Sequence, residues 1–347
     1  MSENRRVKRG APINAPKENS YRYEFEKPLA ELEHRLQQAQ QAADPRHPEA
    51  LKALEQQCEQ LRRKIYGNLT PWQRVQLARH PQRPYTLDYI TQIFSNFVPL
   101  HGDRLFKDDR ALVGGFAKLD GRPCVVLGHQ KGRDTKENLM RNFGSAHPEG
   151  YRKALRLMRL GEKFHMPIII LIDTPGAYPG IGAEERGQAH SIAQNMREMG
   201  RLHTPIYVCV IGEGGSGGAL GVGVGDWAAM LENAYYSVIS PEGCAAILWR
   251  DRARAPDAAA ALKLTWKDLL ALGVIDESIE EPLGGAHRDP ELVAERLRAS
   301  ILRFLKLVDP IPVAELLERR YQRFRKIGAF TTQTPVIPNP APAAPST

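Results

Sequence analysis

Hydrophobic residues along the chain form short apolar runs that alternate with longer segments of helical spacing. The runs at 167–172 and 205–211 each begin with proline and are otherwise apolar, which predicts strands that are buried on both faces. Each run leads into a glycine-rich turn and then into a segment with helical periodicity. Two such strand–turn–helix units in succession predict an α/β core.

The same pattern predicts the other elements of this core. Two strands at 111–119 and 124–129 flank Asp120-Gly121, a dipeptide typical of a tight β-hairpin. Shorter strands are predicted at 227–230 and 235–239. Helices are predicted at residues 85–97, 148–165, 183–199, 241–249, 266–272, 289–307 and 311–327.

Before the core, apolar positions three and four residues apart predict two amphipathic helices, at 28–39 and 51–65. We expect them to form a helical hairpin, followed by a linker-like stretch at 67–84. The organisation predicted for the whole chain has four parts. They are a disordered N-terminus (1–20), a helical extension (21–80), the main domain (81–330) and a disordered proline-rich tail (331–347).

Composition narrows the function only a little. The 347 residues carry a net charge of +8, which favours an anionic partner such as a phosphate-bearing ligand, an acidic protein or RNA. A basic stripe of Arg152, Arg156, Arg159 and Lys163 fits either a solvated helix face or a phosphate or partner site. The four scattered cysteines offer no zinc-site spacing. Without a signal-like or membrane-spanning segment, we expect a cytoplasmic protein.

The densest motif is the glycine run after the second buried strand, where residues 212–218 contain five glycines in seven positions. A strand that ends in such a turn at the start of a helix leaves backbone N–H groups without partners. These donors stabilise an anion, or a carbonyl oxygen that becomes one during a reaction. The turn at Gly176-Ala177 follows the other buried strand, so we expect the two turns to face a shared cleft.

Two other interpretations match parts of these motifs. Asp173-Thr-Pro-Gly176 matches the D-x-x-G signature of GTPases, but the chain has no upstream phosphate-binding loop. Ser216 lies in a G-x-S-x-G pattern, and Asp276 and His287 follow in the order of an α/β-hydrolase triad. The pattern alone therefore leaves a serine hydrolase open.

Several long motifs in one order resemble the carboxyltransferase alpha subunits of bacterial acetyl-CoA carboxylases, over about residues 22–330. The motifs are Arg83–Tyr89, Gly128–Arg133, Asn142–Gly144, Pro148–Arg156, Asp173–Gly180, Gly182–Gln188, Gly212–Leu220, Ser237–Cys244 and Glu281–Arg288. The resemblance implies a ClpP/crotonase-type fold with an N-terminal helical hairpin extension. It leaves residues 1–20 and the tail from Thr331 without a counterpart, and residues 252–260 are only loosely similar.

The resemblance also implies an activity. It is the transfer of a carboxyl group from carboxybiotin, held on a biotin carboxyl carrier protein, to acetyl-CoA, which gives malonyl-CoA for fatty-acid synthesis. The expected partners are a separate zinc-bearing beta subunit in an α₂β₂ assembly, together with biotin carboxylase. No metal is expected in this chain. A stand-alone enoyl-CoA hydratase or isomerase of the crotonase type is the enzymatic alternative, and an RNA-binding protein is the non-enzymatic one.

The family mechanism assigns roles to particular residues. The backbone N–H groups of Gly217 and Gly218 would stabilise an oxyanion, with Gly176 and Ala177 as a second pair. Gly214 and Gly215 are expected in substrate binding. Separately from the family mechanism, the position of Lys131 and Arg133 on the loop after a strand suggests the hypothesis that they bind a carboxylate or a phosphate of CoA.

Overall fold

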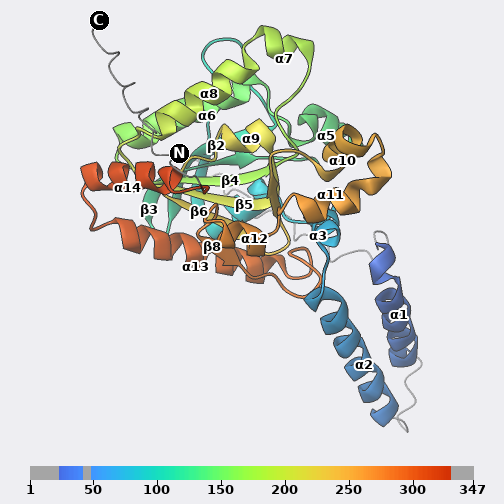
Figure 1. Ribbon diagram of the computed structural model, residues 1–347. Coiled ribbons are helices and arrows are strands. Elements are labelled where there is room, and N and C mark those ends of the chain that lie inside the picture. The colour runs from blue at the N-terminus through green and yellow to red at the C-terminus, as the bar shows by residue number, and fades with distance from the viewer. Residues whose placement is uncertain (1–22, 42–47, 330–347) are drawn as a thin grey trace, which may run out of the picture.

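The computed structural model describes residues 23–41 and 48–329, which form a central sheet covered by helices and a protruding helical hairpin (Figure 1). Hydrogen-bonded neighbours in the sheet follow the order β1-β2-β3-β4-β5-β6-β8, with β7 paired to β5. The pairs β1–β2 and β2–β3 are antiparallel, and all others are parallel. The strands are β1 (Ser95–Pro99), β2 (Leu112–Leu119), β3 (Arg122–His129), β4 (Ile168–Thr174), β5 (Ile206–Gly215), β6 (Trp227–Leu231), β7 (Tyr235–Ser237) and β8 (Glu277–Ile279).

Strands β4 and β5 lie at the centre of the sheet, and every residue of both is buried. This confirms the prediction of two strands buried on both faces. Their β-branched side chains suit a parallel sheet that is covered by helices on both sides. Since β4 and β5 are adjacent and parallel, the turns that follow them emerge at the same edge.

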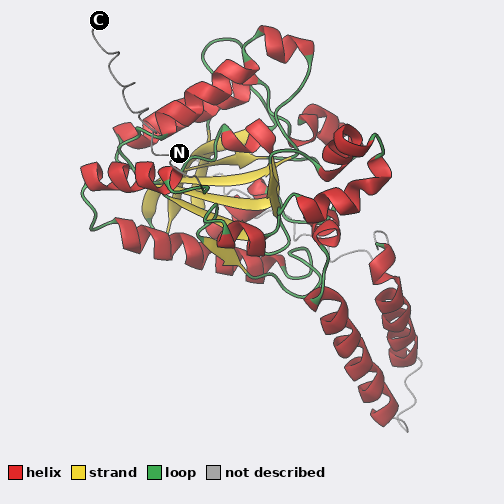
Figure 2. Ribbon diagram, viewed as in Figure 1, coloured by secondary structure: helices red, strands yellow, loops and turns green. Residues whose placement is uncertain are grey.

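Helices cover both faces of this sheet, with α6 and α8 on one side and α13 on the other (Figures 1 and 2). On α6, Tyr151, Ala154, Leu155 and Met158 are all buried. The helices of the domain are α4 (Thr86–Ile93), α5 (Thr135–Met140), η2 (Asn142–Gly144), α6 (Pro148–Lys163), α7 (Ile181–Glu185), α8 (Gln188–Met199), α9 (Ser216–Leu220), α10 (Pro241–Trp249), η3 (Arg252–Arg254), α11 (Ala255–Ala261), α12 (Trp266–Ala271), α13 (Pro290–Val308) and α14 (Val313–Arg325).

The predicted helical hairpin is present as α1 (Lys27–Gln41), which follows the short η1 (Glu24–Glu26), and α2 (Pro48–Gly67). Arg62 of α2 forms an ion pair with Glu33 of α1 at 3.0 Å. The hairpin projects away from the sheet (Figure 1). The predicted disordered ends lie outside the described residues, and the division between extension and main domain stays a prediction.

The prediction of a linker at 67–84 is wrong, because α3 (Pro71–Ala78) lies inside it. Thr70 caps this helix by accepting a hydrogen bond from the Gln73 N–H, and the Gln73 side chain returns a bond to the Thr70 N–H. This capping box was a sequence signal for a helix start. Val75 and Ala78 then pack with Tyr235 of β7 in a buried cluster.

Three further differences concern two helices that end or break earlier than predicted and one strand that was not predicted. The predicted helix 85–97 stops at Ile93, and residues 95–99 pair with β2 as an edge strand. The predicted helix 183–199 is broken at Gly187, whose φ of 80° lies in the left-handed region. Strand β8 was not predicted. By contrast, Asp120 and Gly121 take φ values of 49° and 84°, as the predicted hairpin turn requires.

All four cysteines are buried and free of disulfides. Among residues 23–41 and 48–329, no helix combines the length and apolar character needed to cross a bilayer.

Candidate active site

The two glycine turns lie against each other at the edge of the sheet where β4 and β5 end. An added Cβ on Gly218 would lie 2.5 Å from the Ala177 nitrogen, and one on Gly215 would lie 2.2 Å from the Pro175 oxygen. Distances under 3 Å to backbone atoms leave no room for a side chain. The two turns are therefore adjacent, while the cleft that they were expected to share stays a prediction. Glycine is required here because backbone packs on backbone.

The backbone donors of these turns differ in availability. The Gly176 N–H donates to the Thr174 Oγ1 at 3.1 Å, so it is already engaged within its own turn. For Gly217, Gly218 and Ala177, no hydrogen bond from the N–H is present among the described residues. Gly217 and Ala177 are half-buried, while Gly218 is buried. Three of the four predicted donors thus have no acceptor among the described residues.

Gly214 and Gly215 belong to the end of strand β5 and not to the loop after it. They pair with Tyr236 and Ser237 of β7, and both are buried. The chain turns only at Ser216, which has a φ of 52°. Positive φ at a non-glycine residue is uncommon and marks a sharp change of direction. The contacts of these two glycines are those of sheet residues, and their expected part in substrate binding stays a prediction.

Lys131 lies beneath the two turns, between two carboxylates. Its Nζ is 2.6 Å from the Asp173 Oδ1 and 2.9 Å from the Glu213 Oε1, and its side chain is 12% exposed. Burial by itself lowers the pKa of Lys131, but the two carboxylates outweigh burial and raise it above the ordinary value. Burial likewise raises the pKa of Glu213, yet Lys131 and Arg79 lower it to about 2. Lys131 and Glu213 are therefore both charged at neutral pH.

Arg133 is held on the outside of the same loop. Its guanidinium donates to the carbonyl oxygens of Pro81 and Arg83 at 3.0 and 2.9 Å and pairs with Asp88. It also lies 4.0 Å above the ring of Tyr85. The charges of Lys131 and Arg133 are therefore both paired within the chain, and the substrate-binding roles of these two residues stay predictions.

The triad of a serine hydrolase is not assembled. Asp276 forms an ion pair with Arg323 at 2.9 Å and accepts the Ala228 N–H, while the ring of His287 stacks on His80 with centroids 3.7 Å apart. No hydrogen bond joins Ser216 to either residue in the described part of the chain. The G-x-S-x-G match comes from the density of glycine and not from a nucleophile.

The basic stripe on α6 is largely used within the fold. Arg152 pairs with Asp103 at 2.8 Å, and Arg159 pairs with Glu198 at 2.9 Å. Arg156 donates to the carbonyl oxygens of His101 and Gly102. These contacts favour the structural alternative over a dedicated phosphate site.

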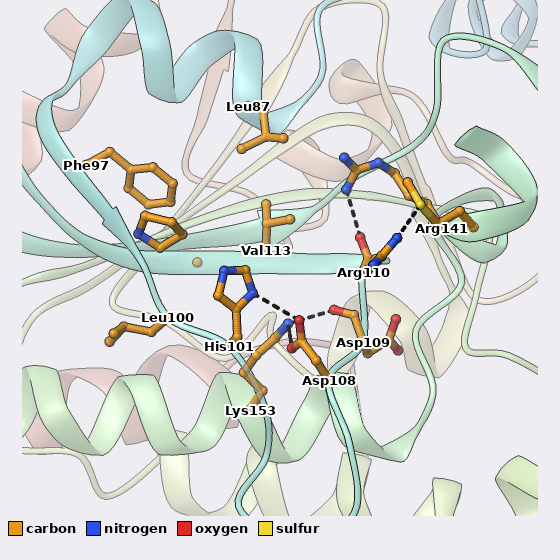
Figure 3. Close-up of a pocket in the computed structure, with 13 residues that line it drawn as sticks. Leu87, Phe97, Leu100, His101, Asp108, Asp109, Arg110, Val113, Arg141 and Lys153 are labelled. Carbon is orange, nitrogen blue, oxygen red and sulfur yellow. Dashed lines mark hydrogen bonds and ion pairs between the residues drawn. The ribbon is translucent and has the colours of Figure 1, made fainter. Parts of the chain in front are cut away.

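Two cavities near the sheet differ in their relation to the turns. One of about 230 Å³ is lined by Lys131, Arg79, Glu213 and Pro175, so it adjoins the first turn. Another, of about 460 Å³, lies among β1, β2, α4 and α6 (Figure 3). In it, Asp108 pairs with His101 and Lys153 (Figure 3), and no residue of either turn lines it. The larger cavity has no contact with the turns, so its size does not make it the candidate site. We take the turns, with the smaller cavity beside them, as the candidate site.

Sequence reasoning missed the charged residues that support the turns, namely Asp173, Glu213 and Arg79. Asp173 and Glu213 are 1% and 6% exposed. Their signal was an acidic residue near the end of an otherwise apolar strand. Arg79 carried no such signal, because its partners are more than 130 positions away.

Comparison with known sequences gives close matches over most of the chain. Residues 22–328 match the family described as "Acetyl co-enzyme A carboxylase carboxyltransferase-like". A protein of Geobacter metallireducens named "Acetyl-coenzyme A carboxylase carboxyl transferase subunit alpha" is 58% identical, over 90% of this chain and 99% of the relative. A protein of the same name from Burkholderia multivorans is 54% identical, over 90% and 98%.

Solved structures resemble the fold at low sequence identity. A transcarboxylase 12S structure aligns with a TM-score of 0.53 and 19% identity, covering 67% of this chain and 44% of that one. A Pseudomonas malonate decarboxylase hetero-dimer aligns with a TM-score of 0.50 and 17% identity, covering 63% and 92%. These likenesses confirm the predicted crotonase-type fold class.

Proposed function

Because the chain belongs to the acetyl-coenzyme A carboxylase carboxyltransferase family, as an alpha subunit, we propose that its paired glycine turns stabilise negative charge during carboxyl transfer. The chain is a transferase component and not a stand-alone enoyl-CoA hydratase or isomerase. Its substrates are carboxybiotin, presented on a separate carrier protein, and acetyl-CoA. The product is malonyl-CoA.

The chemistry creates two oxyanions. Carboxybiotin releases CO₂, and the electron pair of the broken N–C bond leaves negative charge on the ureido oxygen of biotin. The ureido nitrogen then takes a proton from the methyl group of acetyl-CoA, and the enolate carbon attacks CO₂. Fixed N–H donors that face these oxygens lower the barrier because they need no reorganisation as charge develops.

One observation carries the proposal, namely the N–H groups of Gly217 and Gly218, which have no acceptor among the described residues. They lie on a turn whose backbone touches the turn of Ala177, which offers a third N–H without an acceptor. We assign Gly217 and Gly218 to the biotin oxygen, with Ala177 as an auxiliary donor. No side-chain base is required, since the nitrogen of biotin accepts the proton.

A zinc-bearing beta subunit supplies the other half of the site in this proposal, in an α₂β₂ assembly. Apolar surface beside the turns supports such a partner. Ile181, four residues after Ala177, is 80% exposed, and Leu220, two residues after Gly218, is 40% exposed. Large apolar side chains beside open donors fit a surface that a second protein covers. Biotin carboxylase and the carrier protein complete the system by loading CO₂ onto biotin.

The reverse reaction tests the proposal directly. The chain is purified alone and together with the zinc-bearing beta subunit, and carboxylation of free biotin is measured with malonyl-CoA as the donor. We expect turnover only in the mixture, and only when malonyl-CoA and biotin are both present. Turnover by the chain alone contradicts the shared site, and an inactive but correctly assembled complex contradicts the assigned reaction.

A further inference from the structure

The register between strands β4 and β5 shifts just before the two turns. Ile172 pairs with Val210, but Thr174 pairs with Gly214, so β5 contains two more residues than β4 over this interval. The extra residues form a bulge, and bulges redirect a strand locally. The bulge therefore sets the direction in which β5 enters the Gly217-Gly218 turn.

The carboxylate of Asp173 lies inside this bulge. Its Oδ1 accepts the N–H of Glu213 at 2.9 Å, and an added Cβ on Gly212 would lie 2.5 Å from the same oxygen. The same Oδ1 accepts a hydrogen bond from the Lys131 ammonium at 2.6 Å. One buried oxygen on β4 thus holds both the bulged backbone of β5 and the lysine.

Lys131 also contacts β5 directly, through the Glu213 Oε1. The other oxygen of Glu213 accepts hydrogen bonds from Arg79 and from the Tyr235 hydroxyl, each at 2.7 Å. Arg79 in turn pairs with Glu242 at the start of α10. Five charged groups and one hydroxyl therefore link α3, the loop after β3, both turn-bearing strands, β7 and α10.

The count of charges argues against a role in capturing an anionic substrate. Lys131 and Arg79 supply two positive charges, and Asp173, Glu213 and Glu242 supply three negative ones. The ammonium of Lys131 already binds two buried carboxylates, so its attraction for an additional anionic substrate is weak. Its effect is to keep the two carboxylates, and the strands that carry them, close together.

We infer that Lys131, through Asp173 and Glu213, is a positioning residue that holds the two glycine turns in the relative arrangement their N–H groups need. The inference rests on the proposed function for its consequence in catalysis. It deepens that function by assigning the alignment of the donors to a cation outside either turn. A donor must lie within about 3 Å of the developing oxyanion, so a small shift of one turn weakens its contribution.

Replacement of Lys131 by methionine keeps the length of the side chain and removes the charge. In the complex with the beta subunit, we expect kcat for biotin carboxylation to fall about 100-fold, as for loss of one oxyanion donor. The KM values for malonyl-CoA and biotin should stay within about threefold, because a positioning residue acts on the donors and not on substrate binding. A large rise in either KM with unchanged kcat means that Lys131 binds substrate, which overturns the inference.

Lys153→Met is the matched control. Lys153 is also a buried lysine, with its Nζ 2.5 Å from the Asp108 Oδ1 and 2.6 Å from the Asp109 carbonyl oxygen. Neither of these partners belongs to either of the two glycine turns. Both variants should unfold at a lower temperature, and only Lys131→Met should lose kcat. Equal losses of stability with kcat preserved in both reduce Lys131 to a structural residue and overturn the inference.

A double variant tests whether charge balance matters. Lys131→Met with Glu213→Gln removes one positive and one negative charge, so Asp173 no longer faces a second carboxylate. We expect kcat to recover at least about tenfold over Lys131→Met alone. If Lys131→Met does not fold, Glu213→Gln alone takes its place, with an expected loss of about tenfold. A double variant no better than the single one, or an unaltered kcat in Glu213→Gln, contradicts the inference.

Hydrogen exchange separates this inference from the proposed function. In the isolated chain, peptides covering 174–178 and 214–220 should exchange at least about tenfold faster in Lys131→Met than in Lys153→Met. If they do while the wild-type complex is inactive, the reaction assignment fails and the positioning role stands. If the wild type is active and exchange is equal in the two variants, the positioning role fails.

Discussion

Two largely buried lysines of this chain have similar chemistry and different surroundings. Lys131 and Lys153 each bind a carboxylate within 2.6 Å, and each lines a cavity. The carboxylates at Lys131 come from strands that end in glycine turns with open N–H groups. The partners of Lys153, Asp108 and Asp109, belong to a loop whose backbone they tie down, for instance through the Ala111 N–H to the Asp109 Oδ1 at 2.8 Å.

The comparison teaches that neither a buried ion pair nor a large cavity identifies the reactive part of this molecule. The cavity beside Lys153 is the larger of the two, at about 460 Å³ against about 230 Å³. The region of Lys131 differs because charge inside the fold is adjacent to backbone donors that have no partner within residues 23–41 and 48–329. A buried polar group without a partner is costly, so the buried N–H of Gly218 points to a ligand that completes it.

The largest effect in this comparison is expected from Gly218→Ala. The new Cβ would lie 2.5 Å from backbone atoms of the opposite turn, so the turns must separate. We expect a loss of about 1,000-fold in kcat together with lower stability, measured by biotin carboxylation and thermal unfolding. Gly67→Ala, whose Cβ meets no atom within 4 Å, is the control. Near-normal turnover by Gly218→Ala would show that contact between the turns is dispensable.

A smaller contrast is expected between Asp173→Asn and Asp109→Asn. Both carboxylates are buried and accept backbone N–H groups, Asp173 from Glu213 at 2.9 Å and Asp109 from His147 at 2.6 Å. Each change should lower the melting temperature by several degrees. Only Asp173→Asn should also lower kcat, by about tenfold or more. Equal kcat in the two variants would remove the functional difference between the two regions.

The smallest effect concerns His129, whose buried ring interacts electrostatically with both regions. Neither ring nitrogen has a hydrogen-bond partner in the described structure. Burial, with a smaller contribution from Lys131, lowers its pKa from 6.5 to about 3, although Asp109 acts in the opposite direction. The folded state therefore binds fewer protons than the unfolded state, and stability is lost as pH falls from about 6.5 towards 3.

His129→Leu removes this titration. At neutral pH, its free energy of unfolding should stay within about 1 kcal/mol of wild type, because no hydrogen bond is lost. Between about pH 6.5 and pH 4, wild type should lose about 1 kcal/mol or more relative to the variant, measured by urea unfolding. His190→Leu, at an exposed histidine on α8, is the control. Parallel pH profiles for His129→Leu and wild type would contradict the assignment.

Much of the fold could be predicted from local pattern. The buried strands at 167–172 and 205–211 were found because continuous apolar runs report burial on both faces, and the Asp120-Gly121 hairpin because its turn chemistry is specific. Strand β1 was missed, since Phe97 continues the helical pattern and only pairing with β2 draws residues 95–99 into the sheet. An edge strand depends on its neighbour more than on its own sequence.

The sequence by itself determined which backbone positions carry no side chain, because the glycines at 214, 215, 217 and 218 act through covalent structure alone. It also determined membership of the family, through long motifs in a fixed order. Only the tertiary structure decided that Lys131 lies between Asp173 and Glu213 and that Arg79 reaches Glu213. Ion pairs between residues 42 to 134 positions apart depend on the path of the chain, and no local periodicity records that path.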